Sequence, residues 1–328
     1  MFVSVVMAVY NAEDYVEEAI KSILNQTYHQ IELIIVNDAS TDRTHEILES
    51  IKDSKVKIIH LDKNQGAAHC LNLGIKQANG SWIAIQDADD LSLPNRIEEQ
   101  VKYVTKNPGI AAVGSFIHCI HGKEIISKEL LLMEEEGYNA SSEHLKEHRF
   151  FSSFICHGSV MFSKSVFDQL GGYNPAYKIA YDYDLWMRML EILPFHKLPK
   201  VLYEYRIHQD SLSRLKRQDT VNEVWLISSK NIQKNLADRL NRKPHFVIIG
   251  DRWTCKEFKN VACTENSLSV YDLYYKNNRS LSSKIYKLYC TGKVDAVIFL
   301  NSYKLLGIYE QLKQQGLIFN ENLFRIMV

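Results

Sequence analysis

The 328-residue sequence is 46% apolar, and 39 Lys and Arg balance 39 Asp and Glu to a formal charge of zero. This length allows about two domains of roughly 150 residues each. The composition is that of a globular protein and excludes a largely disordered or fibrous chain. The balanced charge argues against a nucleic-acid partner, because such proteins carry a basic excess on one face.

Neither a membrane span nor an exported protein is indicated. No apolar run approaches the roughly 20 residues that cross a bilayer, and residues 1–10 lack the basic region and cleavage site of a signal peptide. The cysteines are scattered, without the spacing of a zinc site. We therefore expect reduced thiols in a cytoplasmic protein, and peripheral membrane association stays open.

The first ninety residues alternate between strands and helices. Apolar runs predict strands at 2–9, 31–36, 56–61 and 82–85, and amphipathic stretches predict helices between them. Asn11 is expected to cap the first helix, and Gly80 is expected to end the third in the left-handed conformation. Such strand–helix units predict a parallel sheet with right-handed crossovers.

Beyond residue 91 the pattern is mixed. The sequence predicts a helix to about 106, a polar and mobile stretch at 134–149, and a helix at 183–193. Further strands are expected at 110–120, 155–163, 201–207, 245–249, 294–300 and 323–326. We therefore expect a first domain over 1–215, a helical connector over 216–242, and a small C-terminal α/β domain over 243–328.

Carboxylates follow two of the predicted strands. Asp87, Asp89 and Asp90 come directly after the fourth strand, and ligands of parallel sheets bind beyond the carboxyl ends of the strands. A divalent cation would relieve their mutual repulsion, and oxygen ligands suit Mg²⁺ or Mn²⁺. A solvated acidic turn is the alternative. Asp38 closes the second strand, where it could accept the imide N–H of a nucleotide base or cap a helix.

Several motifs together resemble the family 2 glycosyltransferases in order and spacing. They are VSVVMAVYN (3–11), SILNQT (22–27), IIVNDASTD (34–42), NQG (64–66), NLG (72–74), DADD (87–90), HGS (157–159), GGYN (171–174), DYDLW (182–186) and YRIH (205–208). The resemblance covers about residues 1–213. It implies the GT-A fold, a Rossmann-like and mainly parallel sheet flanked by helices, and an inverting transfer from a nucleoside diphosphate sugar, usually a uridine one.

The resemblance also implies a role for each matching residue. Asp182 matches the general base of inverting members. Asp89 would hold the metal against the diphosphate, and His208 matches a position that completes the metal or phosphate contacts. His157 and Asp90 are candidates for the acceptor site. The remaining residues expected to bind the nucleotide sugar are Ala8, Tyr10, Glu13, Asp38, Asn64, Gly66 and Asp87.

Some positions depart from the family's pattern. Tyr181 precedes the expected base where the family commonly has glutamate, Ala8 replaces a frequent proline, and Leu71 replaces a frequent arginine. Asp184 lies two residues after Asp182, so a shift of register would exchange the two as the base. On a helix these two side chains point to different faces.

The expected activity is a metal-dependent hexosyl or N-acetylhexosaminyl transfer from a UDP-sugar to a glycan or lipid-linked acceptor, in the synthesis of cell-surface polysaccharide. The alternative is a non-catalytic protein that keeps the fold and binds a glycan or nucleotide sugar. Two other enzyme classes fit less well. A nucleotidyltransferase needs a glycine-rich basic loop after the first strand, and a dinucleotide oxidoreductase needs a GxGxxG motif. The sequence contains neither.

Overall fold

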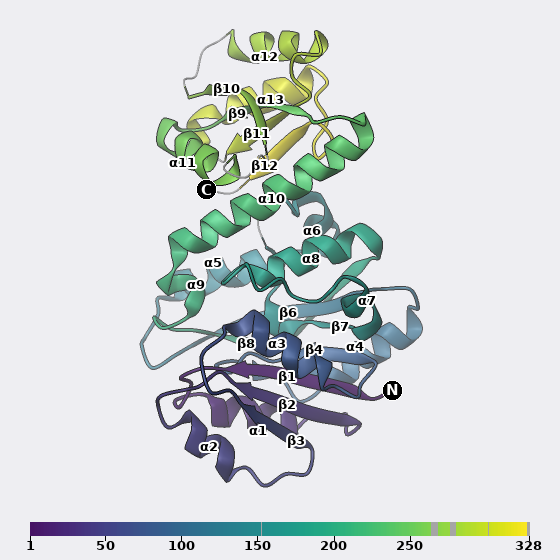
Figure 1. Cartoon of the computed structure of the whole chain (residues 1–328), viewed down its shortest axis with the longest axis vertical. Coiled ribbons are helices and arrows are strands. Elements are labelled where there is room, and N and C mark those ends of the chain that lie inside the picture. Colours follow the sequence, from purple (N-terminus) through teal and green to yellow (C-terminus); the bar gives the residue numbers. More distant parts are fainter. Residues whose placement is uncertain (152, 264–267, 276–279, 301, 327–328) are drawn as a thin grey trace. The chain divides into compact units, whose positions relative to one another are not determined.

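The computed structural model describes residues 1–151, 153–263, 268–275, 280–300 and 302–326 (Figure 1). The chain divides into two units, Met1–Lys146 with Phe154–Leu215, and Glu147–Ser153 with Lys216–Val328. The segment expected as a connector therefore groups with the second unit, and so does the short segment Glu147–Ser153, which lies inside the first domain proposed from sequence.

The first unit is built on one mixed sheet. Among the described residues this sheet has eight strands in the order β3-β2-β1-β4-β7-β6-β8-β5. Strands β1 to β4 run parallel, whereas β7 is antiparallel to both of its neighbours. The strands are β1 (Val3–Val9), β2 (Ile31–Asn37), β3 (Val56–His60), β4 (Trp82–Ile85), β5 (Leu91–Ser92), β6 (Ala112–His121), β7 (Met161–Ser163) and β8 (Phe195–Ile207).

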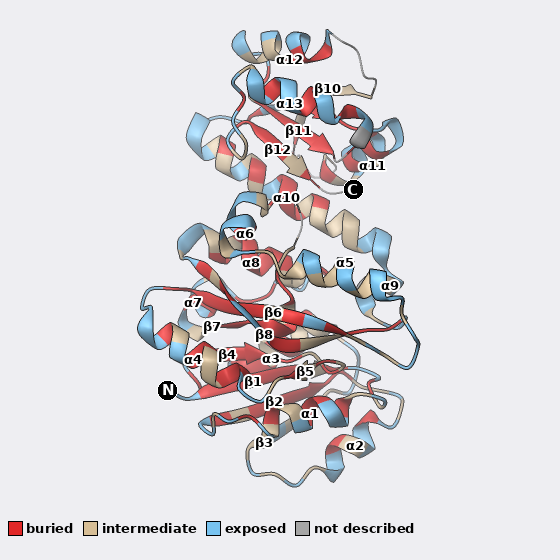
Figure 2. Cartoon of the chain, turned by 180° about the vertical axis from the view of Figure 1, so that it is seen from behind, coloured by how far each residue is buried: buried red, intermediate tan, exposed pale blue. Residues whose placement is uncertain are grey.

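Helices cover both faces of this sheet, which is why β1 and β2 are buried along their lengths (Figure 2). Alternate residues of a strand point to opposite faces. Val5 packs with helices α1, α2 and α4, whereas Val6 packs with α3, α7 and α8. The helices of this part are α1 (Val16–Leu24), α2 (Thr44–Ser50), α3 (Ala67–Lys76), α4 (Arg96–Lys106), α5 (Lys128–Tyr138), α6 (Ser142–His148), α7 (Lys164–Gln169), α8 (Tyr181–Ile192) and α9 (Leu212–Leu215), with the 3₁₀ turn His157–Ser159.

The second unit is a smaller parallel sheet in the order β10-β9-β11-β12. Its core joins Val247 and Val297 of the sheet to Ile285 and Leu312 of two covering helices. Its elements are α10 (Arg217–Leu240), β9 (His245–Ile249), α11 (Arg252–Ala262), β10 (Ser269–Tyr274), α12 (Leu281–Cys290), β11 (Ala296–Leu300), the 3₁₀ turn Tyr303–Leu305, α13 (Leu306–Gln314) and β12 (Leu323–Ile326).

This architecture confirms the predicted fold class, a mainly parallel α/β sheet flanked by helices with a smaller α/β part. Local details differ. The polar stretch at 134–149, expected to be mobile, contains the end of α5 and all of α6. Helix α1 begins at Val16, without a cap from Asn11.

Gly80 is needed for space and not for the left-handed conformation expected of it. It has no positive φ. A Cβ atom there would lie 2.6 Å from the backbone nitrogen of Ser4. Among the described helices, none combines the length and apolar character that a membrane span requires.

Candidate active site

Asp38, at the end of β2, is buried and organises the loop that follows β3. Its two carboxylate oxygens accept hydrogen bonds from the backbone N–H groups of Gln65 (2.7 Å) and Gly66 (2.8 Å). Asn64 donates from its amide to the carbonyl oxygen of Asp38 at 3.4 Å. The structure thus joins Asp38, Asn64 and Gly66 into one group, and Asp38 acts inside the protein as an acceptor of backbone N–H groups.

The residues expected near the base or ribose lie at the end of β1 and just beyond it. Ala8 is half-buried and Tyr10 is exposed. The carboxylate of Glu13 accepts hydrogen bonds from the backbone N–H (2.9 Å) and from Nε (3.2 Å) of Arg43. The backbone N–H of Glu13 donates to Asp42 at 3.0 Å. These contacts tie the loop after β1 to the loop after β2.

The loop at residues 86–90 follows β4, and the side chain of its first residue, Gln86, holds the rest of the loop in place. The amide of Gln86 donates to the carbonyl oxygens of Asp87 (3.0 Å) and Asp90 (2.9 Å). Asp90 is buried and accepts the backbone N–H of Arg206 at 2.7 Å. Burial, together with the charges of Asp89 and Asp87, raises the pKa of Asp90 well above its ordinary value. Asp90 therefore connects the loop to β8.

Asp89 faces His208, which follows β8. Nε2 of His208 lies 2.8 Å from Oδ2 of Asp89, and Nδ1 of His208 is buried without a hydrogen-bond partner in the part of the chain that the structure describes. No group of three or more His, Cys, Asp or Glu side chains among the described residues is arranged to hold a metal ion. One carboxylate and one imidazole still fit Mg²⁺ or Mn²⁺, because such ions take few protein ligands when phosphates supply the others.

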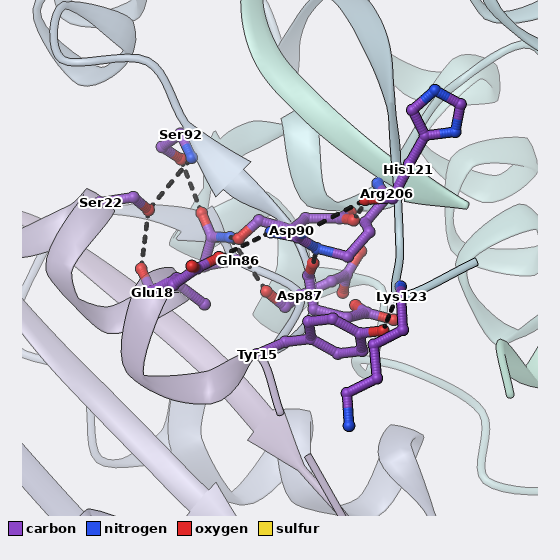
Figure 3. A network of polar contacts seen from close by, with 12 residues as sticks. Tyr15, Glu18, Ser22, Gln86, Asp87, Asp90, Ser92, His121, Lys123 and Arg206 are labelled. Atoms are coloured by element: carbon purple, nitrogen blue, oxygen red, sulfur yellow. Dashed lines mark hydrogen bonds and ion pairs between the residues drawn. The ribbon is translucent and has the colours of Figure 1, made fainter. Parts of the chain in front are cut away.

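Arg206 crosses this site from β8 and was given no role from the sequence (Figure 3). Its guanidinium donates to the carbonyl oxygen of Asp89 at 2.7 Å and to the carboxylate of Glu18 at 3.0 Å. It also donates to the carbonyl oxygen of His121 at 3.2 Å and lies over the ring of Tyr15 at 4.8 Å. The sequence offered no signal for this role, because β8 carries several other charged side chains.

His157 links the acidic loop to helix α8. Its Nδ1 lies 3.3 Å from Oδ1 of Asp87, and its Nε2 lies 2.9 Å from the hydroxyl of Tyr173. Its ring also packs against the rings of Tyr181 and Trp186. Burial lowers the pKa of His157, but the charge of Asp87, the hydrogen bond to it and the charge of Asp182 together raise the pKa above the ordinary 6.5. Both ring nitrogens are therefore engaged within the protein.

Asp182 lies in the first turn of α8 and is half-buried. Burial raises its pKa above the ordinary value, and the charge of His157 with a backbone hydrogen bond offsets only part of that effect. Asp184 is in a different environment. It forms an ion pair with Arg188 at 2.6 Å, and Arg188 also donates to the carbonyl oxygens of Leu170 and Gly172.

The candidate site residues predicted from the sequence thus fall into two groups in the structure. One group surrounds the loop after β4 and comprises Asp87, Asp89, Asp90, His157 and His208, with Asp182 close enough to His157 to influence its pKa. The other lies at the ends of β1 and β2 and comprises Ala8, Tyr10, Glu13, Asp38, Asn64 and Gly66. Because β1 lies between β2 and β4, both groups occupy the same edge of the sheet.

The fold of the first unit is similar to that of solved GT-A glycosyltransferases. TarS residues 1–349 of S. aureus, solved in complex with UDP, aligns with a TM-score of 0.54 at 19% identity, over 71% of this chain and 65% of that one. The mannosyltransferase PcManGT from Pyrobaculum calidifontis, solved with GDP-Man and Mn²⁺, aligns with a TM-score of 0.52 at 19% identity, over 74% and 65%. This chain spans less than two thirds of either solved chain, and the similarity is one of fold.

Sequence similarity identifies the family. The glycosyl transferase family 2 model matches residues 4–171. An uncharacterized glycosyltransferase of Haemophilus influenzae is 32% identical over 294 residues, which are 88% of this chain and 85% of that protein. The O-antigen biosynthesis glycosyltransferase WbnJ of Escherichia coli is 35% identical over 220 residues, 65% and 82% of the two chains. The chain belongs to glycosyl transferase family 2, as the resemblance of its motifs predicted.

Proposed function

We propose that this glycosyltransferase moves a sugar from a nucleoside diphosphate sugar, a uridine one, to a hydroxyl group of a glycan or lipid-linked acceptor, with inversion at the anomeric carbon. One observation carries the proposal. His157 connects Asp87, in the acidic loop after β4, to the start of α8, where Asp182 lies. Groups suited to a diphosphate and a group suited to a proton transfer therefore belong to one site.

The donor would bind along the edge formed by β1, β2 and β4. Tyr10, Glu13 and the loop held by Asp38 would contact the base and ribose, and Asp87 would contact the ribose. Asp89 and His208 would hold Mg²⁺ or Mn²⁺, which, when bound, neutralises charge on the departing diphosphate. A nucleotide-sugar donor is supported by the proteins of similar fold that were solved with UDP and with GDP-Man.

Asp182 would accept the proton of the acceptor hydroxyl as the new glycosidic bond forms. A carboxylate whose pKa is raised by burial is a stronger base than an exposed aspartate. The anomeric carbon would pass through an oxocarbenium-like transition state, as in glycoside hydrolysis. A single displacement inverts its configuration and needs no covalent nucleophile. Asp184 is unsuited to this role because Arg188 already neutralises it.

A role in the synthesis of a cell-surface polysaccharide is supported by the similarity to WbnJ, which is named as an O-antigen biosynthesis glycosyltransferase. The reaction would take place on the cytoplasmic side, where nucleotide sugars are made. His157 would support the site through Asp87 and would not bind the acceptor itself, because both of its ring nitrogens are already engaged.

The proposal is tested by measuring UDP release. The protein is incubated with a panel of UDP-sugars and Mn²⁺, with and without EDTA, and with oligosaccharide acceptors. Metal-dependent release that needs an acceptor supports the proposal, and NMR of the product gives the anomeric configuration. Binding of donors without any turnover would instead support the non-catalytic alternative. Retention of configuration would contradict the direct displacement.

A further inference from the structure

Tyr181 is the first residue of α8 and is half-buried. Its ring packs edge-on against His157 at 5.6 Å and against Tyr173 at 5.5 Å between centroids. In the part of the chain that the structure describes, the Tyr181 hydroxyl makes no hydrogen bond. The two neighbouring tyrosines differ, since the Tyr173 hydroxyl binds His157 and the Tyr203 hydroxyl accepts the backbone N–H of Asp87.

Carboxylates from the acidic loop and from α8 influence the pKa of this hydroxyl. Burial and then the charges of Asp87, Asp182 and Asp89 raise the pKa of Tyr181 well above its ordinary value. The phenol is therefore neutral and stays a hydrogen-bond donor at physiological pH. It lies within electrostatic reach of Asp89, which faces the diphosphate, and of Asp182, the base beside the acceptor.

In a direct displacement the transferred sugar lies between the departing diphosphate and the base. Tyr181 is half-buried, lies next to Asp182 in the first turn of α8, and packs against His157, which holds Asp87. We infer that the Tyr181 hydroxyl donates a hydrogen bond to a hydroxyl group of the transferred sugar and contributes to donor selection. The inference rests on the proposed function.

The residue type is suited to this role. A glutamate at position 181 would add a fourth negative charge to Asp87, Asp89 and Asp182, and it could only accept hydrogen bonds when ionised. Tyrosine adds no charge, offers one donor, and presents an aromatic edge to the sugar.

The test compares Tyr181→Phe with the wild type by calorimetry in Mn²⁺. The ligands are UDP alone and the UDP-sugar that gives the most UDP release in the assay above. We expect the affinity for the UDP-sugar to fall roughly 3- to 10-fold, as for loss of one neutral hydrogen bond, and the affinity for UDP to stay the same. Tyr103→Phe on α4 is the matched control and should leave both affinities unchanged.

Deoxy analogues of the sugar provide a second measurement that does not depend on how well the variant folds. One deoxy analogue should bind wild type more weakly by the same factor, and Tyr181→Phe should then cause no further loss with that analogue. Equal affinity of Tyr181→Phe and wild type for the UDP-sugar, or an equal loss for UDP, overturns the inference. Failure of wild type to bind any nucleotide sugar overturns the proposed function itself.

Discussion

His157 and Asp87 form an ion pair beneath the acidic loop, with Nδ1 of the imidazole 3.3 Å from Oδ1 of the carboxylate. The side chain of His157 is 10% exposed and that of Asp87 is 33% exposed, so the pair reaches from the protein interior to the surface of the site. The carboxylate raises the pKa of the imidazole, and the imidazole holds the carboxylate in place. This pair therefore connects the acidic loop after β4 to the residues that pack against helix α8.

The pKa of His157 should depend on the carboxylate of Asp87. Asp87→Asn should lower the pKa of His157, because the charge of Asp87 and the hydrogen bond to it counteract the effect of burial. NMR of the imidazole resonances over a pH series measures this value. Asp168→Asn, at an exposed carboxylate on α7, is the control and should leave the titration unchanged. A His157 that titrates at the same pH in Asp87→Asn would contradict the ion pair.

The pH dependence of stability follows from the same pair. The pKa of His157 is raised in the folded state, so its contribution to stability is complete below the unfolded value of 6.5 and is lost as the pH rises through the folded pKa. His157→Gln should therefore reduce the free energy of unfolding more at about pH 5.5 than at about pH 8.5. Urea denaturation at the two pH values measures the difference. A larger loss at the higher pH would refute this sign.

Removal of Asp89 should abolish the effect of metal on donor binding. Without its carboxylate, His208 alone cannot hold Mn²⁺ against a diphosphate. In Asp89→Ala, addition of Mn²⁺ should no longer increase the affinity for UDP, whereas in wild type we expect an increase of at least roughly tenfold. Calorimetry in Mn²⁺ and in EDTA measures both. Asp210→Asn serves as the control, and a metal effect that persists in Asp89→Ala would remove Asp89 from the metal site.

Asp182 and Asp184 should respond differently to substitution. Asp182→Asn should lower kcat by roughly 10²- to 10⁴-fold and leave donor affinity unchanged, because it removes only the general base. Asp184→Asn should instead lower the free energy of unfolding by about 2 kcal/mol, less than the 3–5 kcal/mol of a fully buried pair, since Arg188 is 26% exposed. Steady-state kinetics and urea denaturation separate the two. Full transfer activity in Asp182→Asn would refute its role as the base.

Glycine at position 158 is required for space. A Cβ atom there would lie 1.9 Å from the hydroxyl oxygen of Tyr203 and 2.8 Å from a carboxylate oxygen of Asp87. Gly158→Ala should therefore lower the melting temperature and displace Asp87. Gly137→Ala on α5 is the contrasting variant, because nothing lies within 4 Å of its Cβ position and alanine favours a helix by up to about 1 kcal/mol. It should raise the melting temperature slightly, and a higher melting temperature for Gly158→Ala would be inconsistent with this packing.

Much of the fold could be predicted from local patterns. The apolar runs of β1, β2 and β4 identify strands because a sheet covered on both faces excludes polar residues from their interiors. The same reasoning places Asp38 and the loop at 86–90 at one edge of the sheet. Helix α5 was not predicted from the sequence, because none of its residues is fully buried; Leu131 and Tyr138 are half-buried against a small apolar cluster.

By itself, the sequence determined the order of the elements, the family, and the residue types that gather at the sheet edge, since these depend on neighbours a few positions apart. Only the tertiary structure decided the partner of each residue. It places His208 beside Asp89 across 119 residues of chain, and His157 beside Asp87 across 70. It also pairs Asp184 with Arg188. Such pairings arise when distant segments close against one sheet, and no local periodicity encodes that closure.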